Sequence, residues 1–125
     1  MTLSIQNSIL QANDLSLGYK KGKKSNIVAE QISFSLKKGK LTCLLGPNGV
    51  GKSTLIKTIM GQVPALKNQV YLDNKPTDLF SIKDLAKKIA VVLTEKISSG
   101  NLTVEEIVSL GRIPHTGWSG YLSEN

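Results

Sequence analysis

A glycine-rich segment, residues 46–54 with the sequence GPNGVGKST, has the residue types and spacing to hold phosphate. It fits the pattern G-x-x-x-x-G-K-[ST], in which glycines let the backbone curl so that successive N–H groups point inward. The positive end of a following helix adds to the same spot. Lys52 can reach the β- and γ-phosphates as a point charge, and the Ser53 hydroxyl can ligate Mg²⁺. These residues predict a binding site for the phosphates of a nucleotide.

A nucleotide hydrolase also needs a carboxylate that orients water near the γ-phosphate, usually at the end of an apolar strand beside the loop strand. Asp73 follows the short apolar run 70–72, but Asn74 comes next, and the pair is typical of a turn. Glu95 lies two residues beyond the apolar run 89–93. Neither carboxylate makes a hydrolytic site alone, so no catalytic residue is assigned.

The strands that must position the loop are indicated by the apolar pattern. Residues 9–19 and 32–36 alternate apolar with polar side chains, which predicts half-buried strands, and the Lys/Gly/Ser/Asn stretch 20–26 between them is expected to be a loop. Residues 41–45 and 90–93 are nearly continuous apolar runs, the pattern of strands covered on both faces. Residues 70–72 predict a further short strand.

Three helices are expected between and after these strands. The first spans residues 51–60, where Leu55, Ile56 and Ile59 recur at helical spacing. In the second, Ser81 is the expected cap, Asp84 lies in the first turn, and the apolar residues are Ile82, Leu85 and Ile89. In the third, Thr103 and Glu106 fit a capping box, Gly111 ends the helix, and the expected buried face is Val104, Ile107, Val108 and Leu110. Because strands and helices alternate, the fold class is α/β.

Size and charge limit the remaining possibilities. The 125 residues allow one compact domain at most, and the apolar runs are far shorter than the roughly 20 residues that span a bilayer. No secretory signal is expected at the N-terminus, and the single cysteine, Cys43, fits a reducing compartment. The net charge is +7, with 16 basic and 9 acidic residues. The lysines among residues 20–24 are expected to be a solvated loop, and Arg112 is the one arginine, which argues against nucleic-acid readout.

Together these segments resemble the ATP-binding cassette (ABC) ATPases that power ABC transporters. Residues 46–54 are similar to the family's Walker A loop, and residues 15–19, LSLGY, resemble the start of its N-terminal β-region. Residues 102–108 and 111–115 resemble the subgroup that serves importers of siderophores, haem and cobalamin. The resemblance implies a P-loop NTPase core with an antiparallel β-region. It also implies that residues 1–125 are the N-terminal part of a nucleotide-binding domain, without the helical subdomain and the C-terminal half.

The resemblance further implies ATP and Mg²⁺ as cofactors. It places Tyr19 on the adenine, Lys52 on the β/γ oxygens and Thr54 near the α-phosphate. The implied nucleotide-binding residues are Tyr19, Asn48, Gly49, Val50, Gly51, Lys52, Ser53 and Thr54. Ser53 is also the implied ligand of Mg²⁺.

The sequence departs from the family pattern in two ways. Where the family has its Q-loop glutamine, this chain has Thr94 and Glu95, and Glu95 is an oxygen donor that can ligate Mg²⁺ in its place. The family's LSGGQ signature, Walker B carboxylates and switch histidine are also missing, since residues 122–125 lack the two glycines and no Walker B strand precedes His115. The chain is therefore expected to bind ATP without turning it over.

For the whole protein, the resemblance implies the nucleotide-binding subunit of an importer of iron complexes. Hydrolysis by a dimer of ATPase subunits would drive the transmembrane permease subunits, and the protein would be cytoplasmic and peripheral at the inner face of the cell membrane. Arg112, His115 and Trp118 are candidates for contact with the permease.

Two alternatives stay open at this point. A self-contained small P-loop kinase or NTPase would use Glu95 as its acidic residue, but it would need arginine clamps on the transferring phosphate. A basic nucleic-acid-binding module would bind oligonucleotides with a steep salt dependence that is insensitive to Lys52→Ala. Of the two kinds of partner, we expect protein subunits and no nucleic acid.

Overall fold

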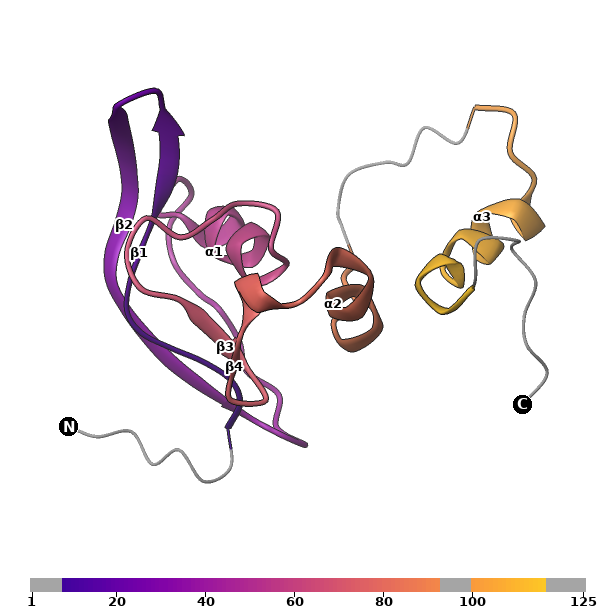
Figure 1. Ribbon diagram of the computed structural model, residues 1–125, viewed down its shortest axis with the longest axis horizontal. Helices are drawn as coiled ribbons and strands as arrows, with labels where there is room; N and C mark the ends of the chain where they lie inside the picture. The colour runs from indigo at the N-terminus through magenta and orange to yellow at the C-terminus, as the bar shows by residue number, and fades with distance from the viewer. Residues whose placement is uncertain (1–7, 93–99, 117–125) are drawn as a thin grey trace. The chain divides into compact units, whose positions relative to one another are not determined.

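The computed structural model describes residues 8–92 and 100–116, and these fall into two compact units that divide between Ser81 and Ile82 (Figure 1). Four strands make one antiparallel sheet in the first unit, in the order β2-β1-β3-β4. The second unit is helical where it is described. Among the residues described, no helix is long and apolar enough to cross a membrane.

A long antiparallel hairpin dominates the first unit. Strands β1 (Ser8–Lys21) and β2 (Lys24–Lys37) are each 14 residues long, and Lys21 pairs with Lys24, so only Gly22 and Lys23 form the turn. Gly22 has a φ of +62°, as two-residue hairpin turns that match the twist of the strands require. The expected loop over residues 20–26 is therefore wrong, because the strands continue through the lysines.

The short strand β3 (Val70–Leu72) pairs with the other edge of β1, and β4 (Lys75–Pro76) follows it. The predicted turn at Asp73 and Asn74 is confirmed, since both residues have positive φ, +49° and +62°. The apolar core of this unit is gathered around β1. Its buried members are Leu10, Ala12, Leu15, Leu17, Leu55, Val70 and Leu72.

Helix α1 (Lys52–Ile59) packs against the hairpin and confirms the first predicted helix. Its buried side chains are Thr54, Leu55 and Thr58. Ile56, expected on the apolar face, is instead 41% exposed. After α1, the chain runs beside β1, where the Ser16 N–H donates to the Lys67 carbonyl at 3.1 Å and the Leu66 N–H donates to the Ser16 carbonyl at 2.9 Å. A short 3-10 helix, η2 (Thr77–Leu79), follows β4.

Gly18 lies where β1, β2 and the segment after α1 come closest together. A Cβ atom on Gly18 would lie 2.1 Å from the Asn26 carbonyl oxygen and 2.6 Å from Cδ1 of Leu66. Neither distance is possible for real atoms, so any side chain here would force the strands apart. Glycine at this position allows the close packing of β1 against Asn26 and Leu66, next to Tyr19.

Two expected strands do not form. Residues 41–45 have no strand structure, with Leu41 95% and Leu45 87% exposed, and residues 90–92 are also irregular, with Val92 98% exposed. The rest of the second run, Leu93, lies outside the described residues. A strand buried on both faces needs neighbouring strands and covering helices, and within residues 8–92 and 100–116 no strand pairs with either segment.

The second unit contains α2 (Ile82–Lys88), α3 (Val104–Leu110) and the 3-10 helix η3 (Ile113–His115). Both predicted α-helices are confirmed, with Asp84 in the first turn of α2 and Gly111 at the C-terminal end of α3. The expected buried face of α3 is wrong. None of its residues is buried, and Val104 and Val108 are 79% and 70% exposed. The Lys83 ammonium donates to the Thr116 carbonyl at 2.8 Å, which links α2 to the end of η3.

The capping box of α3 is confirmed in detail. The Thr103 N–H donates to the Glu106 carboxylate at 2.7 Å, and the Glu106 N–H donates to the Thr103 hydroxyl at 3.2 Å. The hydrogen bonds from the backbone and then the side chain of Thr103 hold the pKa of Glu106 below its ordinary value of 4.5.

We expect the helicity of α3 to fall as the pH drops below about 4.5. A lowered pKa in the folded state means that the carboxylate stabilises the helix above the ordinary pKa, and that this contribution disappears as the pH falls through the lowered value. Cα chemical shifts of residues 104–110, followed from pH 7 to 2.5, measure the effect. Glu106→Gln should weaken the pH dependence, whereas Glu105→Gln, in the same turn, should retain it. A profile unchanged by Glu106→Gln would contradict this role.

Gly18→Ala should lower the free energy of unfolding of the first unit by roughly 1–3 kcal/mol, because the added methyl group would overlap with Asn26 and Leu66. Chemical denaturation followed by circular dichroism measures the change. Ser25→Ala, on the exposed part of the same hairpin, is the control and should change stability by less than about 0.5 kcal/mol. Equal denaturation midpoints for Gly18→Ala and the unchanged chain would contradict the prediction, because they would show that the neighbouring residues accommodate the methyl group with no loss of stability.

Candidate functional site

The glycine-rich loop leads directly into the N-terminus of α1. Gly51 precedes the helix with a φ of +102°, a conformation that side chains disfavour, and no side chain caps the helix. The first helical hydrogen bond runs from the Leu55 N–H to the Gly51 carbonyl at 2.8 Å. The N–H groups of Lys52, Ser53 and Thr54 come before it and have no acceptor within the helix. This end of α1 therefore presents backbone donors and the positive end of the helix dipole.

Strand β2 packs closely against the loop. A Cβ atom on Gly51 would lie 3.1 Å from Cγ1 of Val28 and 3.4 Å from Cβ of Ala29. Glycine at position 51 therefore meets two requirements: it adopts a positive φ, and it has no side chain that would crowd Val28 and Ala29 of β2. The contact with Val28 and Ala29 escaped the sequence analysis, since nothing local marks two residues that meet a loop more than twenty positions away.

The Lys52 side chain turns back over the loop. Its ammonium donates to the carbonyl oxygens of Gly46 at 2.6 Å and Pro47 at 2.7 Å. An ammonium has three donors, so these bonds leave one N–H for a ligand. The bonds hold the ammonium against the first two residues of the loop that leads into α1.

Tyr19 and Thr54 are also brought together. The Tyr19 hydroxyl lies 3.4 Å from the Thr54 hydroxyl, with either group able to donate. Thr54 is buried, Tyr19 is 44% exposed and Ser53 is exposed. The structure therefore joins β1 to the phosphate loop and leaves much of the Tyr19 ring accessible. Asn48, Gly49 and Val50 complete the exposed part of the loop.

Of the two candidate carboxylates, the structure describes the position of Asp73. Asp73 lies in the β3–β4 turn, where its N–H donates to the Ile9 carbonyl at 2.9 Å, and Glu95 lies outside the described residues, as do Thr94 and Trp118. Within the described part of the chain, no three His, Cys, Asp or Glu side chains are placed to hold a metal ion. Within the described residues, the geometry of the glycine-rich loop supplies backbone donors and the Lys52 ammonium, and it assigns no role to Asp73.

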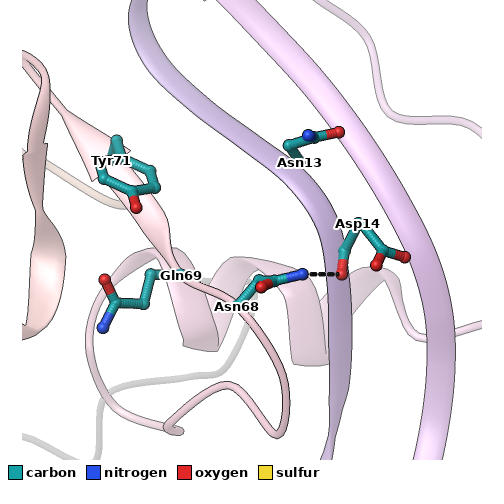
Figure 2. A pocket seen from close by; sticks show the side chains of 5 residues that line it. All are labelled: Asn13, Asp14, Asn68, Gln69 and Tyr71. Atoms are coloured by element: carbon teal, nitrogen blue, oxygen red, sulfur yellow. Dashed lines mark hydrogen bonds between the residues drawn. The ribbon is translucent and has the colours of Figure 1, made fainter.

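A separate polar depression of about 540 Å³ lies beside β1 and β3, lined by Asn13, Asp14, Asn68, Gln69 and Tyr71 (Figure 2). The polar groups of Asn13, Asp14, Asn68 and Gln69 bond to one another or to nearby residues. The Asn68 amide donates to the Asp14 carbonyl at 2.7 Å, and the Lys67 ammonium donates to the Asp14 carboxylate at 2.7 Å, which raises the pKa of Lys67. These bonds brace the segment after α1 against β1, so the depression is a structural joint.

Comparison with known proteins agrees with this geometry. A family model described as ABC transporter matches residues 29–121. Over 116 residues the chain is 42% identical to an uncharacterized ABC transporter ATP-binding protein of Methanocaldococcus jannaschii, covering 93% of this chain and 39% of that protein. Over 115 residues it is 37% identical to the iron(3+)-hydroxamate import ATP-binding protein FhuC of Bacillus subtilis, covering 92% and 41%. The chain thus spans about two fifths of the length of these relatives.

A solved structure of the ATP-binding subunit of an ABC transporter has a similar fold. It matches with a TM-score of 0.74 and 26% identity, covering 86% of this chain and 43% of that one. The predicted fold class, an α/β core of the ABC ATPase type with an antiparallel β-region, is confirmed. The family match and the loop at the start of α1 agree, and this chain belongs to the ABC transporter family of ATP-binding proteins.

Proposed function

We propose that this chain carries the nucleotide-phosphate site of the ATP-binding subunit of an ABC importer, and that residues 1–125 are the first part of its nucleotide-binding domain. The observation that carries the proposal is the placement of the Lys52 ammonium, 2.6 Å from the Gly46 carbonyl, on the loop that leads into the N-terminus of α1, a helix that no side chain caps. A fixed cation and several backbone donors at one point suit a polyphosphate.

The residues of the loop fit ATP and Mg²⁺. The backbone of residues 48–51 would surround the phosphates, Lys52 would contact the β- and γ-phosphates, and Thr54 would lie near the α-phosphate. ATP supplies the phosphoanhydride bond whose hydrolysis releases free energy. The accessible Tyr19 ring, held beside Thr54, would stack on the adenine. Mg²⁺ would be bound by the Ser53 hydroxyl, with Glu95 as a second oxygen ligand.

We further infer that the complete protein hydrolyses ATP as a dimer and drives the uptake of an iron complex such as a siderophore, haem or a cobalamin-like compound. The 37% identity to a protein named for iron(3+)-hydroxamate import supports this substrate class. So do the residues 111–115, GRIPH, that resemble this subgroup. The partners would be transmembrane permease subunits and a second ATPase subunit, with the protein peripheral at the inner face of the cell membrane.

Lys52→Ala should weaken the binding of Mg·ATP by about 10- to 100-fold, because the variant loses one charge-assisted contact worth roughly 1.5–3 kcal/mol. Isothermal titration of the 125-residue chain measures the affinity. Lys57→Ala removes the same charge from the exposed end of α1 and is the matched control, expected to bind as the unchanged chain does. Equal affinities for Lys52→Ala and Lys57→Ala would contradict the proposed phosphate site. Multiple turnover of ATP by the chain, abolished by Lys52→Ala, would overturn the expectation of binding without hydrolysis.

The role of Glu95 is tested through the metal. If Glu95 ligates Mg²⁺, Glu95→Ala should reduce the gain in ATP affinity that Mg²⁺ provides, with little change in affinity when EDTA is present. Glu105→Ala, which removes a carboxylate from α3, is the control. An unchanged response of Glu95→Ala to Mg²⁺ would remove Glu95 from the site.

A further inference from the structure

The turn of the β1–β2 hairpin concentrates positive charge without acidic partners. Lys21 and Lys24 lie directly opposite each other across the two strands. Within residues 8–92 and 100–116, Lys67 forms an ion pair with Asp14, and no ion pair involves a lysine of the turn. Like charges opposite each other destabilise an antiparallel strand pair. An anion in front of Lys21 and Lys24 would remove that repulsion.

The strand register determines which face carries this pair. Side chains alternate between the faces of a strand, and the pairing has no register shift from Gly18 to Lys21. Tyr19, Lys21 and Lys24 therefore share one face, and Lys20 lies on the other. The contact between the Tyr19 and Thr54 hydroxyls, at 3.4 Å, shows that this shared face is turned toward the start of α1. The two lysines thus lie on the side of the hairpin that carries the phosphate loop.

Lys21 and Lys24 lie close enough to the nucleotide site for their charge to act on a bound nucleotide. Lys21 is two residues beyond Tyr19, which is about 7 Å along a strand. The Debye length at 0.1 M salt is about 10 Å, so the field of the two ammonium groups reaches the region of Tyr19 without full screening, and at 0.01 M salt, where this length is about 30 Å, it extends over the loop as well. Figure 1 shows α1 beside the hairpin, whose turn extends beyond the helix. A nucleotide that comes to the loop from that side passes the lysines.

We propose that Lys21 and Lys24 form a cationic approach to the phosphate loop, which accelerates the association of nucleotides in proportion to their negative charge. The inference rests on the proposed function, since it requires a nucleotide at Lys52. It adds a preference among nucleotides for those with more phosphate groups, which the loop motif alone does not predict. For the metal-free nucleotides ATP gains more than ADP, and AMP gains least, because each added phosphate adds negative charge that the lysine field attracts.

The test measures association and dissociation rates of methylanthraniloyl-labelled ATP, ADP and AMP by stopped-flow fluorescence on the 125-residue chain, in EDTA and without Mg²⁺, so that the three nucleotides differ in charge by one phosphate each. In 0.01–0.05 M salt, Lys21→Gln/Lys24→Gln should associate with labelled ATP three- to tenfold more slowly, with a smaller loss for ADP and the smallest for AMP. Dissociation should change less than twofold. Near 1 M salt, where the Debye length is about 3 Å, the difference should disappear.

Lys37→Gln/Lys38→Gln is the matched control, because it removes the same charge at the far end of β2. It should associate within twofold of the unchanged chain. Lys21→Arg/Lys24→Arg should keep the fast association, which separates charge from any change in the hairpin. Equal slowing in both glutamine variants, or equal slowing for ATP and AMP, would overturn the inference. Failure of the unchanged chain to bind any nucleotide would overturn the proposed function as well, so the two failures differ.

Discussion

The first unit depends on the central position of β1. Both β2 and β3 form their hydrogen bonds with it, and the two most deeply buried leucines, Leu15 and Leu17, belong to it. The strand also contacts the helix that follows the phosphate loop, through Tyr19 and Thr54. Because one strand makes all these contacts, the hairpin, the short sheet and α1 are fixed relative to one another within this unit.

The packing of the hairpin also fixes the conformation of the glycine-rich loop, residues 46–54. Its curl requires Gly51 for two separate reasons, a backbone conformation that side chains disfavour and the closeness of β2. The hairpin therefore forms one wall of the loop through Val28 and Ala29, in addition to supplying the tyrosine. A change in the hairpin that moved this wall would alter the direction of the backbone donors even though no loop residue had changed.

Features that depend on neighbours in the sequence could be predicted, whereas features that depend on distant contacts could not. The loop motif, the Asp73–Asn74 turn and the capping box of Thr103 and Glu106 are local, and all three form as expected. The runs 41–45 and 90–93 have the composition of buried strands, but a strand also needs partners, which composition does not supply. For the same reason α3 forms as a helix while Val104, Val108 and Leu110 stay exposed. No local sequence pattern indicates the contact between Val28 and Gly51.

The bonds of Lys52 to the Gly46 and Pro47 carbonyls bear on the entropy of binding. A free lysine side chain loses up to about 2 kcal/mol of rotamer freedom when it is fixed in one place. Here much of that loss accompanies folding, since two of the three ammonium donors are already held. A phosphate that takes the remaining donor then meets a side chain that has little freedom left to lose, and more of the contact energy is expressed as affinity.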